Sequence, residues 1–251
     1  MKPFRNSIVL LLCTLLTTPL MGRELRSIDI ADTSIDLRVF TANGNKLLLG
    51  FPCDEGKSVA EEKTAQSLAD DGIEVWMPDL LSAYMLPNVK SSLGKIPDQA
   101  ITALIEAAMK SGKQVYLIAS GPNTELILRG AALWEQQKKP KLSGAILLFP
   151  RLFKSEPVPG QVPEYIDSVG HTRLPMVVLE GERTPNRWTL NQLTTALAQG
   201  GSNVHAKLIP SVRGDFFKRD DASNPEATAT LQLDGLIKAS LYFLGSTQHN
   251  E

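Results

Sequence analysis

A serine directly follows a short apolar segment of the sequence. Residues 115–119 read Val-Tyr-Leu-Ile-Ala, and Ser120 and Gly121 come next. A short apolar run that ends in small and turn-forming residues is typical of a buried strand, so Ser120 is expected at the carboxyl end of a strand. A serine hydroxyl there could attack an ester or a peptide bond if a neighbouring base removed its proton. The first question is therefore whether the sequence supplies that base.

Histidine is the usual base, and the sequence contains three, His171, His205 and His249. His171 precedes an expected strand and His205 lies near the beginning of another, which places both at the amino edge of a parallel sheet. Sites in open α/β sheets form at the opposite, carboxyl edge. His249 lies in the C-terminal tail. The sequence therefore predicts no histidine beside Ser120.

Acidic residues, in contrast to the histidines, are expected at the carboxyl edge of the sheet. Glu180 and Glu182 follow an expected strand, and Asp215 lies in the loop after a later one. Each of them could assist the hydroxyl of Ser120. The alternative is that all three are solvated loop charges.

Three arginines also follow strand ends, namely Arg151, Arg183 and Arg213. If their side chains converge on the rim that carries the serine, they favour a ligand with a carboxylate or phosphate group. The alternative is three separate arginines, each solvated in its own loop. Phe51 and Cys53, which follow an earlier expected strand, are the other candidate ligand contacts.

Cys53 is a candidate thiol nucleophile, but no histidine is placed to form its thiolate, so a buried structural cysteine is the better interpretation. Residues 50–58 read Gly-Phe-Pro-Cys-Asp-Glu-Gly-Lys-Ser and nearly match a phosphate-binding loop. They have five residues between the glycines where that motif has four, and Pro52 lacks an amide donor. No group of Cys and His residues has the spacing of metal ligands. We therefore predict no metal and no cofactor.

The N-terminal residues have the order of a secretory signal peptide. Lys2 and Arg5 precede the apolar run 8–16, which is shorter than the ~20 residues that cross a bilayer. Cleavage after Gly22 is expected, so residues 1–22 are the predicted signal peptide and the protein is predicted to be periplasmic or secreted. The residue two places before Gly22 is a leucine, larger than signal peptidase usually accepts. An uncleaved N-terminal anchor is therefore the alternative.

Residues 23–251 are expected to form a single domain. Removing residues 1–22 takes away two of the 26 basic residues and none of the 27 acidic ones, which leaves a net charge of −3. This balance argues against a nucleic-acid partner. Cys53 is the one cysteine left, so the domain has no internal disulfide and depends on packing for its stability.

Apolar runs alternate with longer amphipathic stretches along the chain. This alternation predicts an α/β fold, with a mostly parallel sheet and helices on both faces. Residues 150–174 are too few for more than a small lid, so little or no lid domain is expected. The predicted strands are 27–30, 35–40, 46–49, 73–77, 114–119, 145–149, 176–179 and 204–209, and the main predicted helices are 59–70, 97–110, 123–137, 190–199 and 225–244.

This order of elements resembles the α/β-hydrolase fold over essentially all of residues 23–251. Residues 47–51, Leu-Leu-Leu-Gly-Phe, are similar to the strand and turn that carry the oxyanion loop in that superfamily. Residues 77–80, Met-Pro-Asp-Leu, resemble its Pro-Asp-Leu strand end, and residues 178–182, Val-Leu-Glu-Gly-Glu, resemble its His-Gly-Glu turn. Residues 209–217 resemble the loop that presents the catalytic histidine. The resemblance implies a scaffold on which a serine, a histidine and an acid hydrolyse esters or peptides.

The three chemical positions that the resemblance implies are substituted. Alignment on the strand places Gly121 at the nucleophile position, with Ala119 and Asn123 where the sharp turn requires small side chains. Thr184 stands at the acid position, and its hydroxyl cannot stabilise an imidazolium as a carboxylate does. Gly214 stands at the histidine position. The chain therefore resembles a degenerate member of the α/β-hydrolase superfamily.

We expect an exported protein that lacks Ser-His-Asp hydrolysis and binds a small ligand, anionic if the arginines converge, or a partner protein of the cell envelope. Contact with a membrane is expected only if the N-terminal segment stays uncleaved. The alternative is a hydrolase of ester or peptide bonds with a displaced site that uses Ser120. That register would place Ile118 and Pro122 at the two crowded positions of the turn, which sterics disfavour.

Overall fold

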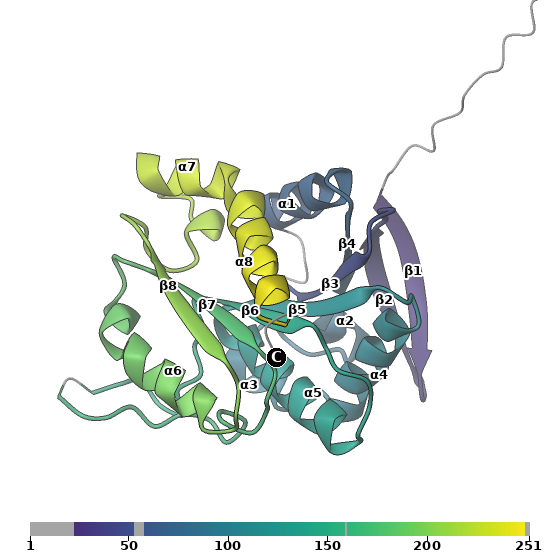
Figure 1. Cartoon of the computed structure of the whole chain (residues 1–251), viewed down its shortest axis with the longest axis horizontal. Helices are drawn as coiled ribbons and strands as arrows, with labels where there is room; N and C mark the ends of the chain where they lie inside the picture. Colours follow the sequence, from purple (N-terminus) through teal and green to yellow (C-terminus); the bar gives the residue numbers. More distant parts are fainter. Residues whose placement is uncertain (1–22, 53–57, 159, 249–251) are drawn as a thin grey trace, which may run out of the picture.

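The computed structural model describes residues 23–52, 58–158 and 160–248, which form one sheet with helices on both faces (Figure 1). The predicted signal peptide and Cys53 lie outside the described residues. The sheet has the strand order β1-β2-β4-β3-β5-β6-β7-β8. The β1–β2 and β2–β4 pairs are antiparallel, and the strands from β4 to β8 pair in parallel. The predicted α/β class with a mostly parallel sheet is confirmed.

The strands lie where the apolar runs predict them, and most extend the predicted range by one to four residues. Their bounds are β1 (Arg23–Ile30), β2 (Thr33–Phe40), β3 (Lys46–Phe51), β4 (Ile73–Pro78), β5 (Gln114–Ser120), β6 (Gly144–Leu148), β7 (Met176–Gly181) and β8 (Val204–Ile209).

Two layers of helices cover the sheet. Helices α1 and α8 pack on one face, and α2 to α6 pack on the other (Figure 1). The helix bounds are α1 (Val59–Asp70), α2 (Leu80–Ala83), α3 (Lys90–Leu93), α4 (Asp98–Met109), α5 (Thr124–Gln136), α6 (Leu190–Ala198), α7 (Asn224–Leu231) and α8 (Leu233–Gln248), with 3-10 turns η1 (Gly121–Asn123), η2 (Pro185–Thr189) and η3 (Phe216–Lys218).

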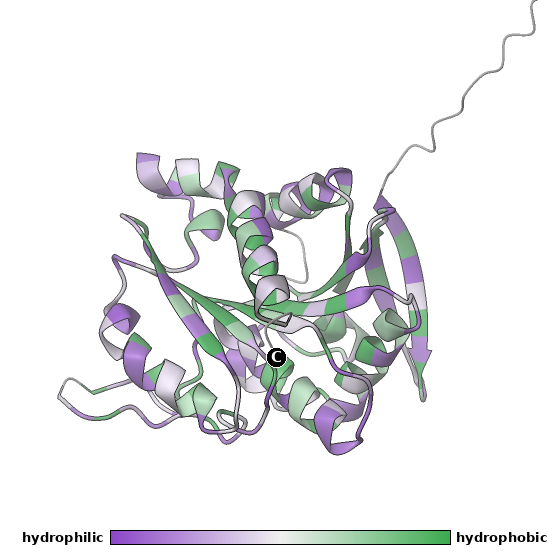
Figure 2. Cartoon of the chain, viewed as in Figure 1, coloured by the Kyte–Doolittle hydropathy of each residue, from purple (hydrophilic) through white to green (hydrophobic). Residues whose placement is uncertain are grey.

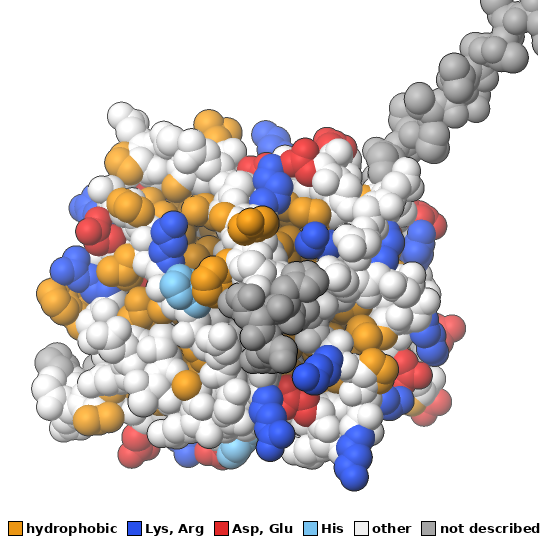
Figure 3. All heavy atoms as spheres, viewed as in Figure 1, with side chains coloured by type: hydrophobic (Ala, Val, Ile, Leu, Met, Phe, Trp, Pro, Cys, Tyr) orange, Lys and Arg blue, Asp and Glu red, His pale blue; other side chains and the backbone are white. Residues whose placement is uncertain are grey.

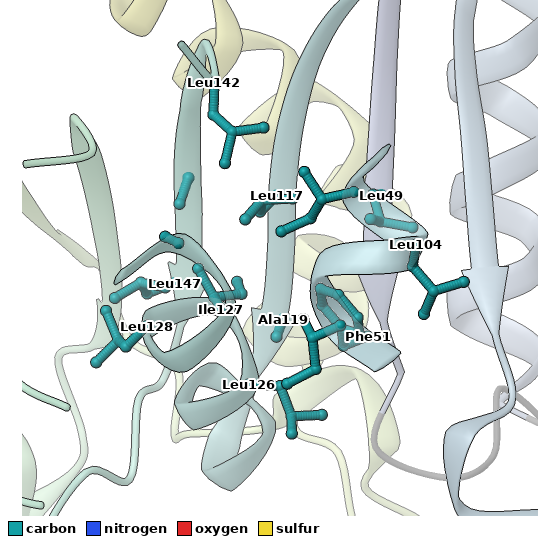
Figure 4. Packing of buried hydrophobic residues seen from close by; sticks show 14 of the residues in the cluster. Leu49, Phe51, Leu104, Leu117, Ala119, Leu126, Ile127, Leu128, Leu142 and Leu147 are labelled. Atoms are coloured by element: carbon teal, nitrogen blue, oxygen red, sulfur yellow. The ribbon is translucent and has the colours of Figure 1, made fainter. Parts of the chain in front are cut away.

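The central strands are apolar on both sides, as expected for a parallel sheet between two helix layers (Figure 2). In β5, Leu117 and Ala119 belong to the core beneath α4 and α5, where Figure 4 shows them beside leucines of these helices. Tyr116 and Ile118 belong to the core beneath α1 and α8. Because side chains alternate along a strand, Ser120 continues the second series and faces α1 and α8.

The last predicted helix is two helices, which corrects the expected single helix. The chain breaks at Gln232, whose φ of −107° and ψ of 11° are not helical. Helix α7 buries Glu226 against the loop before it and leaves Leu231 exposed. Helix α8 instead buries a row of apolar residues on the sheet. The apolar row is Leu233, Ile237, Leu241 and Leu244.

The connection between β6 and β7 carries no lid domain in its described part. Residues 149–158 and 160–175 contain no helix, and Phe153 and Tyr165 form an isolated bridge between them. Among the described helices, none is both long and apolar enough to cross a membrane. Lys and Arg side chains are interspersed with Asp and Glu over the face shown in Figure 3.

Candidate functional site

The carboxyl ends of the parallel strands meet at one edge of the sheet, where ligand sites form in open α/β folds. Strands β3, β5 and β7 end there at Phe51, Ser120 and Gly181. Phe51 is buried in the core beneath α4 and α5 and also lines the cavity that Ser120 lines. The loop after β8 brings Gly214 and Asp215 to the same edge. The predicted site residues therefore share one edge, but their side chains separate into two groups.

The first group surrounds Ser120, which has 3% of its surface exposed. Its side chain lies on the α1 and α8 face of the sheet and does not stand up from the strand end. The Nζ atom of Lys218 donates a hydrogen bond of 3.4 Å to the Ser120 hydroxyl. The same Nζ atom lies 3.8 Å from Oε1 of Glu61 in the first turn of α1. A serine, a lysine and a glutamate thus meet below the edge.

The turn from β5 into α5 is made by Gly121, whose φ is +58°. This left-handed conformation costs a residue with a side chain about 1–2 kcal/mol, and glycine adopts it freely. The Gly121 carbonyl accepts a hydrogen bond of 3.1 Å from the Arg151 amide. Asn123 donates from Nδ2 to the Pro52 carbonyl at 2.7 Å. The sharpest point of the turn therefore carries no side chain.

The second group lies after β7 and β8, where Thr184 and Gly214 are neighbours. A Cβ atom added to Gly214 would lie 3.4 Å from Cγ2 of Thr184. The Thr184 hydroxyl donates to Oε1 of Glu180 at 3.1 Å. The positions that the resemblance assigns to an acid and a histidine are thus in contact, although neither residue present can accept or transfer a proton near neutral pH.

Glu180 is the buried acid of this group, with 1% of its surface exposed. Burial raises the pKa of its carboxyl to about 7, and the nearby Asp215 charge adds to the increase. Hydrogen bonds that the Gly181 amide and the Thr184 hydroxyl donate to Oε1 act in the opposite direction and lower the pKa. Burial has this effect because a desolvated carboxylate is disfavoured relative to the neutral acid. Glu180 is therefore partly protonated at neutral pH.

Asp215 and Arg151 form an ion pair across the edge. Asp215 has a left-handed φ of +54°. Its Oδ1 atom is buried and has no hydrogen-bond partner in the described part of the chain. Arg151 has 56% of its side chain exposed and reaches the aspartate from the loop after β6. The ion pair therefore satisfies only one of the two carboxylate oxygens of Asp215.

Arg213 is held by two acids. Its Nε and Nη2 atoms donate to Oε1 and Oε2 of Glu226, each at 2.7 Å, and Nη1 donates to Asp221 at 2.9 Å. These contacts hold the pKa of the Glu226 carboxyl well below its usual range, with the guanidinium as the main cause. Arg183, in contrast, is exposed. The Arg213 guanidinium therefore fastens its loop to α7.

Aromatic rings fill the space between the two groups. Phe149 follows β6 and has a φ of +49°. Its ring packs edge-on against that of Phe216, with 5.5 Å between the ring centres, and tilted against that of Phe217, with 6.2 Å between the centres. A Cβ atom on Gly214 would lie 3.8 Å from Cβ of Phe149. A histidine at position 214 would therefore have to fit against this aromatic cluster.

The described histidines lie away from this edge. His205 pairs in register with Val177 at the beginning of β7 and stacks on Phe243 at 4.3 Å. His171 is exposed in the loop before β7. His249 and Cys53 lie outside the described residues. Within the described ranges, no group of three or more His, Cys, Asp and Glu side chains could hold a metal ion.

The sequence reasoning missed Lys218 and Glu61. Lys218 follows the Phe216–Phe217 pair in the loop that the resemblance assigns to the histidine, but no pattern in that loop predicts that its side chain reaches Ser120. Glu61 reads only as a favourable acid in the first turn of a helix. Glu226 was also missed, although the spacing of Ser223 and Glu226 is that of a capping box and could have been recognised.

Comparisons with known proteins identify the scaffold. No family model matches the chain, and no curated protein matches its sequence. Solved structures, however, are similar to this chain. ESTFA in its Fe-lacking apo form matches with a TM-score of 0.64 and 10% identity, covering 85% of this chain and 82% of that one. The apo form of Thermogutta terrifontis esterase 2 matches with a TM-score of 0.60 and 16% identity, covering 90% of this chain and 98% of that one. An arylesterase matches with a TM-score of 0.62 and 13% identity, covering 89% and 86%. Together with the strand order, these likenesses show that the chain has the α/β-hydrolase fold.

Proposed function

We propose that this protein uses the α/β-hydrolase fold for binding and does not hydrolyse esters or peptides by Ser-His-Asp chemistry. The observation that carries the proposal is the set of residues at the three chemical positions, Gly121, Thr184 and Gly214. Glycine supplies no attacking oxygen and no base. Without a base, a neighbouring hydroxyl is not activated by the route that serine hydrolases use.

The proposed ligand is a small molecule that binds at the carboxyl edge of the sheet. Arg151 is paired with Asp215, and Arg213 is paired with Glu226 and Asp221. An anionic ligand would have to displace these carboxylates or bind Arg183 alone. The pairing supports an uncharged ligand over an anionic one. We expect inorganic phosphate to shift the melting temperature equally for the wild type and for an Arg151→Ala/Arg183→Ala double variant. A shift that is lost in the double variant would instead support an anionic ligand at these arginines.

A partner protein is the second candidate ligand, and Trp188 favours it. Trp188 lies in η2, the 3-10 turn that begins directly after Thr184, and 75% of its surface is exposed. The guanidinium of Arg187 lies 4.1 Å from the centre of its ring. Trp and Arg are the residue types most often found at the centres of protein interfaces. An envelope protein that binds this edge would therefore use Trp188 as an anchor.

Residual hydrolysis by Ser120 is the alternative function, and the hydrogen bond from Lys218 favours it. A lysine can act as a base for a serine when it is deprotonated. Here the ammonium group is already engaged in an ion pair, with Oε1 of Glu61 at 3.8 Å. The hydroxyl is also buried below the edge. Both observations support the binding proposal over this alternative.

The decisive experiment treats the purified protein with a fluorescent fluorophosphonate and assays short-chain aryl esters. We expect no labelling and no hydrolysis above buffer, for the wild type and for Ser120→Ala alike, because the histidines within the described residues lie away from this hydroxyl. Ser92→Ala is the matched control, since Ser92 is a buried serine on α3. Labelling that disappears in Ser120→Ala and persists in Ser92→Ala would establish the hydrolase and refute the proposal.

We further propose that the protein is exported to the periplasm or the medium and loses residues 1–22 on the way. The proposal rests on the basic residues and the short apolar run at the N-terminus. We expect N-terminal sequencing of the protein from expressing cells to begin at Arg23. A chain that begins at Met1 and sediments with membranes would show the anchored alternative.

A further inference from the structure

A cavity of about 60 Å³ lies between the sheet and the layer formed by α1 and α8. Leu48 and Ile118 line it from the sheet, Ala65 and Leu68 from α1, Ile237 from α8 and Phe217 from η3. The arrangement is visible in Figure 1, where α1 and α8 lie together over β3 and β5. This cavity is on the face of the sheet and is separate from the edge that carries Thr184 and Gly214.

The lining is apolar except at one end. Thr64 lines the cavity, but its hydroxyl donates to the Ala60 carbonyl at 2.7 Å inside the helix, so its methyl group is left for contact. The polar end is formed by Ser120 and Glu61. Lys218 contacts both residues, at 3.4 Å and 3.8 Å. The polar end therefore combines a hydroxyl with an ion pair.

These properties define a ligand. The apolar part of the cavity does not retain water, which needs two to four polar partners, and it gains from being filled by apolar groups. By volume it accommodates a chain of roughly three to five heavy atoms. An added anion would meet the Glu61 carboxylate, and an added cation would meet the Lys218 ammonium, each in a poorly solvated place. A hydroxyl or carbonyl head group would meet neither cost.

We infer that this cavity binds a short aliphatic chain with an uncharged hydrogen-bonding head, of the alcohol class, with the head at Ser120, Glu61 and Lys218. The inference goes beyond the proposed function, because it assigns a second binding place, beside Ser120 and apart from the edge that carries Thr184 and Gly214, and names the chemical class of its ligand. No bond to the serine is formed or broken in this binding.

The test uses three probes of equal chain length, 1-butanol, butyrate and butylammonium, in NMR titrations of the full domain. The methyl groups of Ile118 and Ile237 report on the cavity. We expect saturable shifts with 1-butanol, and binding at least about tenfold weaker for both charged probes. Tighter binding of butyrate, or no saturable shift of these methyl groups with any probe, would overturn the inference.

Two valine variants in one helix separate binding from folding. Ala65→Val adds two methyl groups to the cavity, so we expect a melting temperature about 1–3 °C higher and the loss of at least nine-tenths of 1-butanol binding. Ala69→Val is the matched control, because Ala69 is buried one turn later on α1 and does not line the cavity. It is expected to lower the melting temperature and keep the binding. Binding that survives in Ala65→Val would place 1-butanol elsewhere and overturn the inference.

The outcome is independent of the fluorophosphonate result. If the serine is labelled and the cavity still binds 1-butanol as described, the proposed function fails and the cavity remains. If the serine is not labelled and the cavity does not bind, the non-hydrolytic proposal remains and the ligand class is wrong.

Discussion

The wild-type protein is expected to become less stable as the pH rises from 5 to 8, and the Glu180→Gln variant is expected to lose much less stability over the same range. Burial raises the pKa of the Glu180 carboxyl from 4.5 to about 7 in the folded protein. Between these values the folded state binds a proton that the unfolded state has released. The stabilisation is therefore fully present below pH 4.5 and is lost as the pH rises through 7, by about 3 kcal/mol.

Glutamine keeps the shape of the side chain and can still accept hydrogen bonds from the Gly181 amide and the Thr184 hydroxyl. Urea unfolding at pH 5, 6, 7 and 8 measures the effect as the difference between wild type and variant, which cancels the groups common to both. Glu182→Gln is the matched control, because Glu182 is the half-buried acid two residues further along. It is expected to leave the pH dependence in place. Parallel pH profiles for wild type and Glu180→Gln would show that the carboxyl titrates normally.

Replacing Glu226 with alanine is expected to lower the free energy of unfolding by about 3 kcal/mol, or roughly 6–12 °C in the melting temperature. The Glu226 side chain is fully buried. It accepts hydrogen bonds from the Arg213 guanidinium and amide and from the Ser223 amide and hydroxyl. The variant loses an ion pair and the cap of α7 together, and these contacts are what hold the loop with Gly214 and Asp215 in place.

Asp221→Ala is the control for this prediction. Asp221 pairs with the same guanidinium, but 67% of its side chain is exposed. Solvent and salt screen such a pair, so the melting temperature is expected to move by no more than about 1 °C. Thermal unfolding followed by circular dichroism measures both variants. Equal shifts for the two variants would mean that the burial of Glu226 adds nothing to the value of the pair.

The elements of the sheet could be predicted because their signals are local. A strand buried on both faces is a run of apolar residues between turn residues, and β4, which is buried along its whole length, was predicted to within one residue of its observed bounds. Helix α1 has its predicted bounds, 59–70, and Ser58 caps its N-terminus. The four-residue helices α2 and α3 were not predicted, since so short a segment has too few turns to show a period.

The contacts at the strand ends could not be predicted in the same way. Arg213 follows a strand end in the sequence, and only the folded chain shows that Glu226 binds it from the next helix. Whether Arg151 is available to a ligand likewise depends on Asp215, which approaches it from the loop after β8. Partners of this kind come together by loop geometry, for which the sequence carries no period.

The amino-acid sequence by itself determined the α/β class, the order of the strands along the chain and the residue types at the nucleophile, acid and histidine positions. These follow from side-chain chemistry and from periods of a few residues. The tertiary structure decided which side chains meet: Lys218 and Glu61 at Ser120, and Thr184 at Glu180. It also decided that Glu180 is buried and that a small cavity lies beneath α1 and α8. The physical reason is that burial and proximity belong to the packed chain, in which distant segments exclude water from one another.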